Sequence, residues 1–178
     1  MVRVCEDASK PLVTGTTGID NKEALLASLA RKAAVVSAPN MSVGVNSLLR
    51  LCEGLAGDIG ELSDIEIVEA HHRTKKDVPS GTALEMARLI GARAGKRVVL
   101  GRTGTAGGRS DEIVIHSLRM GDVPGIHTVV FSLKGETLEV THTAQSRECF
   151  AVGALRAARF VAKARPGLYS VLDVLASG

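Results

Sequence analysis

The chain has 178 residues, of which 45% are hydrophobic and 23% are charged. This length and balance predict one domain, or one and a part, with a true core, and they exclude a mainly disordered protein. No apolar run reaches the roughly 20 residues that a membrane-spanning helix needs, and the N-terminus lacks the order of a secretory signal. We therefore expect a cytoplasmic protein with no membrane partner.

Charge and aromatic content limit the ligands further. A net charge of +3, spread along the chain, is too small to indicate a nucleic-acid binder, and an aromatic content of 2% offers no stacking platform. The surplus of positive charge suits a small anion instead. The three cysteines, Cys5, Cys52 and Cys149, have no short spacing, so they indicate ordinary thiols in a reducing compartment.

The first part of the chain alternates between strand and helix patterns. An apolar strand over residues 11–14 runs into a GTTG turn, and a helix over residues 21–32, capped by Asp20, leads to a second apolar strand over residues 33–39. Two strands of this kind, joined by a helix, predict a parallel sheet that is covered on both faces.

Two loops of this unit follow its strands. Because the carboxyl ends of parallel strands meet at one edge, where open α/β sheets hold their ligands, both loops are candidate binding segments. They consist of Gly15, Thr16 and Thr17, and of Ala38, Pro39, Asn40 and Met41.

The rest of the chain mixes helices with alternating strands. The pattern predicts a helix over 43–60, a strand over 64–70, a helix over 82–94 that Ser80 caps and Gly95 ends, strands over 112–120, 127–134 and 137–143, a helix over 147–164 and a short tail over 168–175. We expect the last three strands to form an antiparallel meander. The glycine-rich segment 101–111 is expected to be a lid or crossover, because it lacks the strand and helix that flank a phosphate-binding loop.

The chemistry is concentrated in EAHHRTKKDVPSGTAL, residues 69–84. Basic side chains and the N–H groups of Gly81 and Thr82 at a helix start would form a pocket for carboxylate or phosphate, and the histidines add a proton source near neutral pH. The alternative is a solvated basic loop with a helix cap. A metal site is not expected, because adjacent histidines on an extended segment point to opposite sides and no further ligand is near.

Four further candidate residues lie outside this segment. Arg147, at the start of the last helix, could reach an anion in the same cleft, although a lone arginine there is more often a surface residue. His116, His127 and His142 fall within the alternating strands, and we interpret them as structural.

The segment 69–84 closely resembles the signature of the dihydrodipicolinate reductase family, the 4-hydroxy-tetrahydrodipicolinate reductases of lysine biosynthesis. The resemblance extends over nearly the whole chain. It includes VTGTTG (13–18), SAPNMSVGVN (37–46), SLRMGDVPGIHTVVF (117–131), HTAQSRECFAVGALRAARF (142–160) and GLYSVLDVL (167–175).

The resemblance implies an α/β plus α+β fold. Residues 1–45 and 146–178 would form the C-terminal part of a Rossmann-like nucleotide-binding domain, and residues 46–145 a substrate-binding and oligomerisation domain whose mixed open sheet makes a homotetramer. The family's GxxGRMG segment does not occur in these 178 residues, so the chain is expected to correspond to about the last two thirds of a family member.

The implied reaction is the NAD(P)H-dependent reduction of 4-hydroxy-tetrahydrodipicolinate to tetrahydrodipicolinate in the diaminopimelate route. By resemblance, His71 is the proton donor or acceptor and Lys75 the second proton donor. The substrate carboxylates would be bound by His72, Gly81 and Thr82, with Ser80 and Arg147 as further candidates. The two loops of the parallel sheet would hold the nicotinamide half of NADPH or NADH.

The sequence is compatible with three interpretations. The chain is an active reductase, a non-catalytic dicarboxylate-binding or assembly module that has lost cofactor binding, or a shortened version of a longer reductase. With the first strands of the nucleotide-binding sheet missing, the strand over 11–14 is expected to be an exposed apolar edge that requires a partner strand, a rearrangement or oligomerisation.

Overall fold

The computed structural model describes residues 1–16, 19–104 and 111–177. The chain folds into two compact units, one made of residues 1–46 with 148–178 and the other of residues 47–147. The long helix α3 (Val43–Ile59) begins in the first unit and continues into the second. No helix in these ranges is long and apolar enough to cross a membrane.

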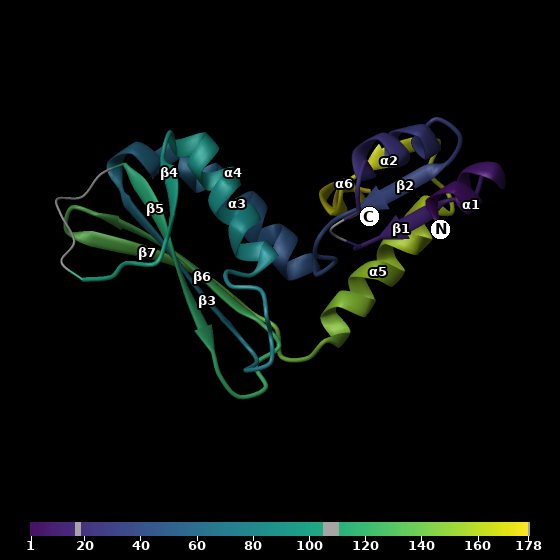
Figure 1. The fold of residues 1–178 in the computed structure, drawn as a ribbon. Helices are drawn as coiled ribbons and strands as arrows, with labels where there is room; N and C mark the ends of the chain where they lie inside the picture. The colour runs from purple at the N-terminus through teal and green to yellow at the C-terminus, as the bar shows by residue number, and fades with distance from the viewer. Residues whose placement is uncertain (17–18, 105–110, 178) are drawn as a thin grey trace. The chain divides into compact units, whose positions relative to one another are not determined.

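The first unit is built on a parallel sheet (Figure 1). Its strands lie in the order β1 (Leu12–Thr14), β2 (Ala34–Ser37) and β8 (Gly167–Tyr169). Its helices are α1 (Val2–Asp7), α2 (Lys22–Ala30), α5 (Glu148–Val161) and α6 (Val171–Ala176).

Alternation along β2 sends its valines to opposite faces of this sheet. Val35 is fully buried in a cluster with Leu26 and Leu29 of α2, whereas Val36 is fully buried in a cluster with residues of α5 and α6. The prediction of a parallel sheet covered on both faces is therefore confirmed.

The start of the first unit differs from its prediction. Helix α2 follows Asn21, which adopts a left-handed conformation with φ of 54° and makes no side-chain cap, so the predicted cap at Asp20 is wrong. Asn tolerates this conformation better than most residues, which lets the chain enter the helix without an aspartate cap. The short helix α1 was not predicted; its Val2 and Cys5 pack against the cluster around Leu29.

β1 is an edge strand in the described part of the sheet. It pairs with β2, and its residues are half-buried because Leu12 packs on the cluster around Leu29 and Val13 on the one around Val36. The need for a partner strand stays a prediction.

The second unit is a five-stranded mixed sheet. The strands lie in the order β4 (Arg97–Leu100), β5 (Glu112–Arg119), β3 (Asp64–His71), β6 (Ile126–Leu133) and β7 (Glu136–Thr143). Helix α3 and helix α4 (Gly81–Ala94) cover one face, and a short 3-10 helix, η1 (Gly60–Leu62), leads into β3 (Figure 1). The core between these layers is apolar and includes Cys52, Ile67, Met86, Ile115 and Phe131.

The predicted meander is wrong for its first strand. β3 lies between β5 and β6, with Ile67 opposite Ile115 on the parallel side and Val129 on the antiparallel side. Alternation reports which face of a strand is buried but not which strand is its neighbour. The short strand β4, which was not predicted, pairs with β5 and extends the parallel part of the sheet.

The ends of α4 agree with their prediction. The Ser80 hydroxyl accepts a hydrogen bond from the N–H of Ala83, and Gly95 ends the helix with φ of 68°, in the left-handed region that glycine favours. Ser80 is thereby fixed beside the end of β3, where the chemistry-bearing segment begins.

Candidate functional site

The site starts from a carboxylate in the core. Glu69 and His71 lie two residues apart on β3, so both side chains point to the helix-covered face. Glu69 is fully buried and His71 is only 8% exposed. A buried carboxylate is costly unless it is paired and hydrogen-bonded, so the groups around Glu69 determine its state.

Arg119 at the end of β5 pairs with Glu69 through both of its terminal nitrogens. Nη1 lies 3.0 Å from Oε2 and Nη2 lies 2.9 Å from Oε1, while the N–H of Ser80 donates to Oε1 at 3.2 Å. Burial raises the pKa of Glu69, but the hydrogen bonds from Arg119 and His71 outweigh it and lower the pKa to about 2. Glu69 is therefore ionised at neutral pH.

The imidazole of His71 is oriented by this carboxylate. Its Nδ1 lies 2.5 Å from Oε2 of Glu69, and because an ionised carboxylate can only accept, Nδ1 must carry the proton. Burial lowers the pKa of His71, and the cations of Lys75 and Arg119 act in the same direction, against the effect of Glu69. His71 is thus neutral at neutral pH, and its Nε2 can take up a proton.

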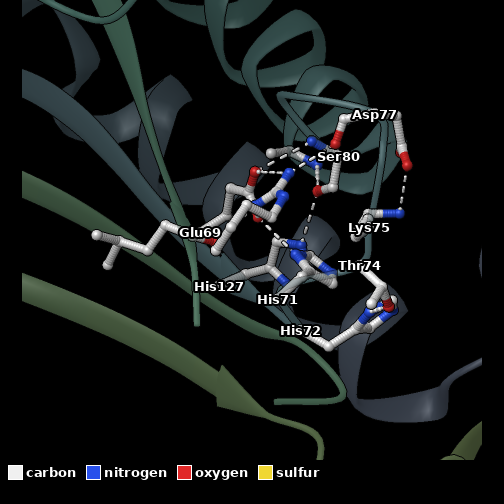
Figure 2. Close-up of polar contacts among 11 residues, drawn as sticks. Glu69, His71, His72, Thr74, Lys75, Asp77, Ser80 and His127 are labelled. Carbon is white, nitrogen blue, oxygen red and sulfur yellow. Dashed lines mark hydrogen bonds and ion pairs between the residues drawn. The ribbon is translucent and has the colours of Figure 1, made fainter. Parts of the chain in front are cut away.

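A second buried histidine lies against the first. The ring of His127, from β6, packs edge-on to that of His71 with centroids 5.2 Å apart, and its Nε2 lies 3.2 Å from the Ser80 hydroxyl. Burial and the neighbouring His71 lower the pKa of His127 to about 4. Although the sequence suggested a purely structural residue, His127 lies inside the cluster (Figure 2).

The loop after β3 carries the remaining predicted residues. The ammonium group of Lys75 lies 2.9 Å from the carboxylate of Asp77, and Nδ1 of His72 lies 2.7 Å from the hydroxyl of Thr74 (Figure 2). His72 and Lys75 are half-buried, so both are open to a ligand. At the start of α4, Gly81 is exposed and Thr82 half-buried, with their N–H groups in the first turn of the helix.

Arg147 is not part of this network. It is exposed at the boundary of the two units, directly before α5, and no hydrogen bond or ion pair joins it to the cluster in the described ranges. Those ranges also contain no group of three His, Cys, Asp or Glu side chains that could hold a metal ion.

The two predicted cofactor loops follow β1 and β2 in the first unit. The N–H of Ala38, at the start of the second loop, donates to the carbonyl of Thr14, the last residue of β1, at 3.2 Å. Asn40 accepts from the N–H of Ser42 at 2.9 Å, and its carbonyl accepts from Asn46 at 2.9 Å.

These loops present both exposed and buried residues at the carboxyl edge of the parallel sheet. Gly15, Thr16 and Pro39 are exposed, Met41 is buried, and Thr17 lies outside the described residues. Exposed residues at this edge lie where open α/β sheets hold their ligands.

Two parts of the site were missed in the sequence. Glu69 precedes His71 by two residues in an alternating strand, and this spacing could have indicated that the pair shares a face. Arg119 could not be found, because its contact with Glu69 depends on the pairing of β5 with β3, whereas the sequence predicted a meander of β5 with β6 and β7.

Fold and site together define a class: an α/β protein in which a parallel sheet unit is joined to a mixed-sheet unit with an acid–base site beside a helix N-terminus. The comparisons specify the family. Residues 1–41 match the model described as "Dihydrodipicolinate reductase, N-terminus", and residues 44–175 match "Dihydrodipicolinate reductase, C-terminus".

Individual relatives agree with this assignment. The chain is 52% identical over 172 residues to the 4-hydroxy-tetrahydrodipicolinate reductase of Rubrobacter xylanophilus, covering 94% of this chain and 66% of the relative. For the protein of the same name from Hahella chejuensis, identity is 44% over 181 residues, covering 98% and 68%.

A solved structure is also similar. The dipicolinate-bound dihydrodipicolinate reductase from Paenisporosarcina sp. TG-14 matches with a TM-score of 0.76 and 25% identity, over 95% of this chain and 66% of that one. The chain belongs to the dihydrodipicolinate reductase family, which confirms the resemblance, and it spans about two thirds of the length of these relatives.

Proposed function

We propose that this chain carries the proton-transfer and dicarboxylate-binding site of an NAD(P)H-dependent reduction of 4-hydroxy-tetrahydrodipicolinate to tetrahydrodipicolinate, in the diaminopimelate route of lysine biosynthesis. The observation that carries the proposal is the buried pair of Glu69 and His71 next to the Lys75 loop. Membership of the reductase family supports the same reaction.

The hydroxyl group leaves with one ring hydrogen as water, and the ring gains one hydride and one proton. When bound, the reduced nicotinamide supplies the hydride. The chain itself must hold an anionic ring and place a proton donor next to the carbon that becomes electron-rich, since general acids contribute about 10²–10⁴-fold to such steps.

His71 is suited to exchange a proton through Nε2. Its Nδ1 is engaged by Glu69, while the ring lies at the surface end of β3 with 10% of its side chain exposed. Binding of a dianionic ring would favour the protonated imidazole and so load the donor when substrate is present.

Lys75 is suited to be the second donor. Its partner Asp77 is 57% exposed, and exposed ion pairs contribute less than about 1 kcal/mol. The ammonium group can therefore exchange Asp77 for a substrate anion at little cost. A retained positive charge would also stabilise the negative charge that develops in the transition state.

The substrate carboxylates are assigned to His72 and to the N–H groups of Gly81 and Thr82, with Arg147 as a further candidate. The N-terminus of α4 favours anions, and the N–H of Gly81 already bonds the carboxylate of Asp77, whose place a substrate carboxylate would take. Ser80 is 2% exposed and already bonded to Ala83 and Glu69, so we assign it to support of the site.

For the cofactor, we assign the nicotinamide half of NADPH or NADH to the loops Gly15–Thr17 and Ala38–Met41. Their place at the carboxyl edge of parallel strands supports this assignment. We also propose that the first unit binds the cofactor and the second unit the substrate. The mixed sheet would form a homotetramer, and the protein would be cytoplasmic.

The test is turnover of NADPH or NADH with 4-hydroxy-tetrahydrodipicolinate. His71→Gln and Lys75→Ala should each lower kcat by about 10²–10⁴. Lys76→Ala, which removes an exposed lysine from the same loop, is the matched control and should leave kcat unchanged. If the wild-type chain binds pyridine-2,6-dicarboxylate but oxidises neither cofactor, it is a binding module and the proposed reduction is wrong for it.

A further inference from the structure

We propose that Glu69 is a positioning residue for His71: its buried carboxylate holds the imidazole in the tautomer with the proton on Nδ1 and so reserves Nε2 for proton exchange. For its catalytic consequence the proposal rests on the proposed function. The tautomer itself can be measured without turnover.

Geometry gives Glu69 this role. Its carboxylate is fully buried, and its Oε2 lies 2.5 Å from Nδ1 of His71, which is the shortest distance that the carboxylate makes. Because both residues project from the same face of one strand, backbone pairing on both sides of β3 fixes their spacing. The sheet therefore determines where the carboxylate of Glu69 lies, and this carboxylate orients the imidazole of His71.

The carboxylate is itself held on both oxygens. Arg119 donates to each of them, Ser80 donates through its backbone to Oε1, and Arg119 is anchored in turn by a 2.6 Å bond to the carbonyl of Asp77. Bidentate pairing of this kind fixes direction as well as charge. Glu69 thus stays anionic and can only accept, whichever state His71 is in.

In the part of the chain that the structure describes, the charged and titratable groups that face His71 all belong to this arrangement. Glu69 is on its own strand, Arg119 on β5, His127 on β6 and Lys75 on the following loop. Glu69 is the one anion among them and favours a protonated imidazole, while Arg119 and Lys75 oppose it. Removal of the Glu69 charge should therefore make His71 harder to protonate.

The variant Glu69→Gln should change the tautomer of His71. Nη2 of Arg119 and the N–H of Ser80 both donate to the Oε1 position, so the amide oxygen should lie there, which leaves the amide nitrogen at the Oε2 position, facing Nδ1 of His71 and Nη1 of Arg119. Nδ1 must then accept, and the proton of the neutral ring moves to Nε2. Glu69→Asp keeps a carboxylate and should retain the wild-type tautomer.

The experiment is nitrogen-15 NMR of the histidine rings in the full chain, with His71 assigned by His71→Gln and titrated over pH. We expect the Nδ1–H tautomer in the wild type and in Glu69→Asp, and the Nε2–H tautomer with a lower His71 pKa in Glu69→Gln. Glu85→Gln, which removes a half-buried carboxylate paired with Arg88, is the control and should match the wild type.

The direction in which the His71 pKa changes in Glu69→Gln distinguishes loss of a positioning residue from general loosening of the site. A loosened site would let water reach His71 and raise its pKa toward the ordinary 6.5, whereas loss of the anion alone lowers it. An Nε2–H tautomer in the wild type overturns the proposal, and this result needs no variant to fold.

Kinetics give the second readout. Glu69→Gln should lower kcat by at least about tenfold and move its pH profile to lower pH, with KM changed less, and Glu69→Asp should recover part of the loss. An active wild type whose Glu69→Gln variant keeps its kcat and pH profile overturns the proposal. Absence of turnover in the wild type counts against the proposed function. The positioning role of Glu69 is then decided by the tautomer measurement alone.

Discussion

A side-chain carbon added to Gly125 would lie 3.1 Å from Nε2 of His71. Gly125 comes directly before β6, and its lack of a side chain keeps open the space beside the nitrogen that we assign to proton exchange. This contact is too close for a methyl group unless the imidazole shifts.

Gly125→Ala is therefore expected to lower kcat/KM by about 10–100-fold, because displacements of about 1 Å at a reacting group have effects of this size. Gly54→Ala is the matched control: it adds the same methyl group in α3, where nothing lies within 4 Å. Unchanged kinetics in Gly125→Ala would show that the space beside Nε2 is not used.

A different glycine supports the predicted cofactor loop. A carbon added to Gly153 of α5 would lie only 1.8 Å from the carbonyl oxygen of Met41, so the helix and the loop 38–41 must separate in Gly153→Ala. We expect a loss of about 1–3 kcal/mol in the free energy of unfolding, the usual cost of overpacking, together with weaker binding of NADPH and NADH.

Urea unfolding and calorimetry measure the two effects. Gly54→Ala again serves as control, and it should raise the free energy of unfolding by about 0.5–1 kcal/mol because alanine is the better helix former. Cofactor affinity that is unchanged in Gly153→Ala would argue against the assignment of loop 38–41 to the nicotinamide.

Buried His127 makes stability depend on pH. Its pKa falls from the ordinary 6.5 to about 4 through burial and the neighbouring His71, so the unfolded chain binds a proton more readily than the folded one. The stability contribution of neutral His127 is fully present above 6.5, is lost progressively as the pH falls toward 4, and amounts to about 3 kcal/mol.

His127→Gln should remove most of this dependence. Urea titrations followed by circular dichroism at several pH values between 4 and 6.5 measure it in the wild type and the variant. His71 and His142, whose pKa values burial also lowers, contribute in the same direction. A variant with the wild-type pH dependence would mean that His127 is not the main group.

The elements that local pattern controls could be predicted from the sequence. Apolar runs predicted the parallel strands β1 and β2, and the capping preferences of serine and glycine predicted that Ser80 and Gly95 mark the ends of α4. The place of β3 between β5 and β6 could not be predicted, because alternation along a strand contains no information about its neighbours.

The same limit applies to the site. His71 and Lys75 lie in one short motif and could be singled out. Arg119 and His127 follow His71 by 48 and 56 residues and belong to other strands. They join Glu69 and His71 through strand pairing and packing. Burial, which decides that Glu69 is an anion and His127 neutral, is likewise a property of the assembled sheet.

We propose that the segment 69–84 binds a planar dicarboxylate and supplies its proton donors. Calorimetric titration of the 178-residue chain with pyridine-2,6-dicarboxylate, with and without NADPH or NADH, tests it most directly. We predict saturable binding at one site, weakened by about tenfold or more in His72→Ala because a charge-assisted contact contributes about 1.5–3 kcal/mol. Absence of binding in the wild type, or equal affinity in His72→Ala, would contradict the account.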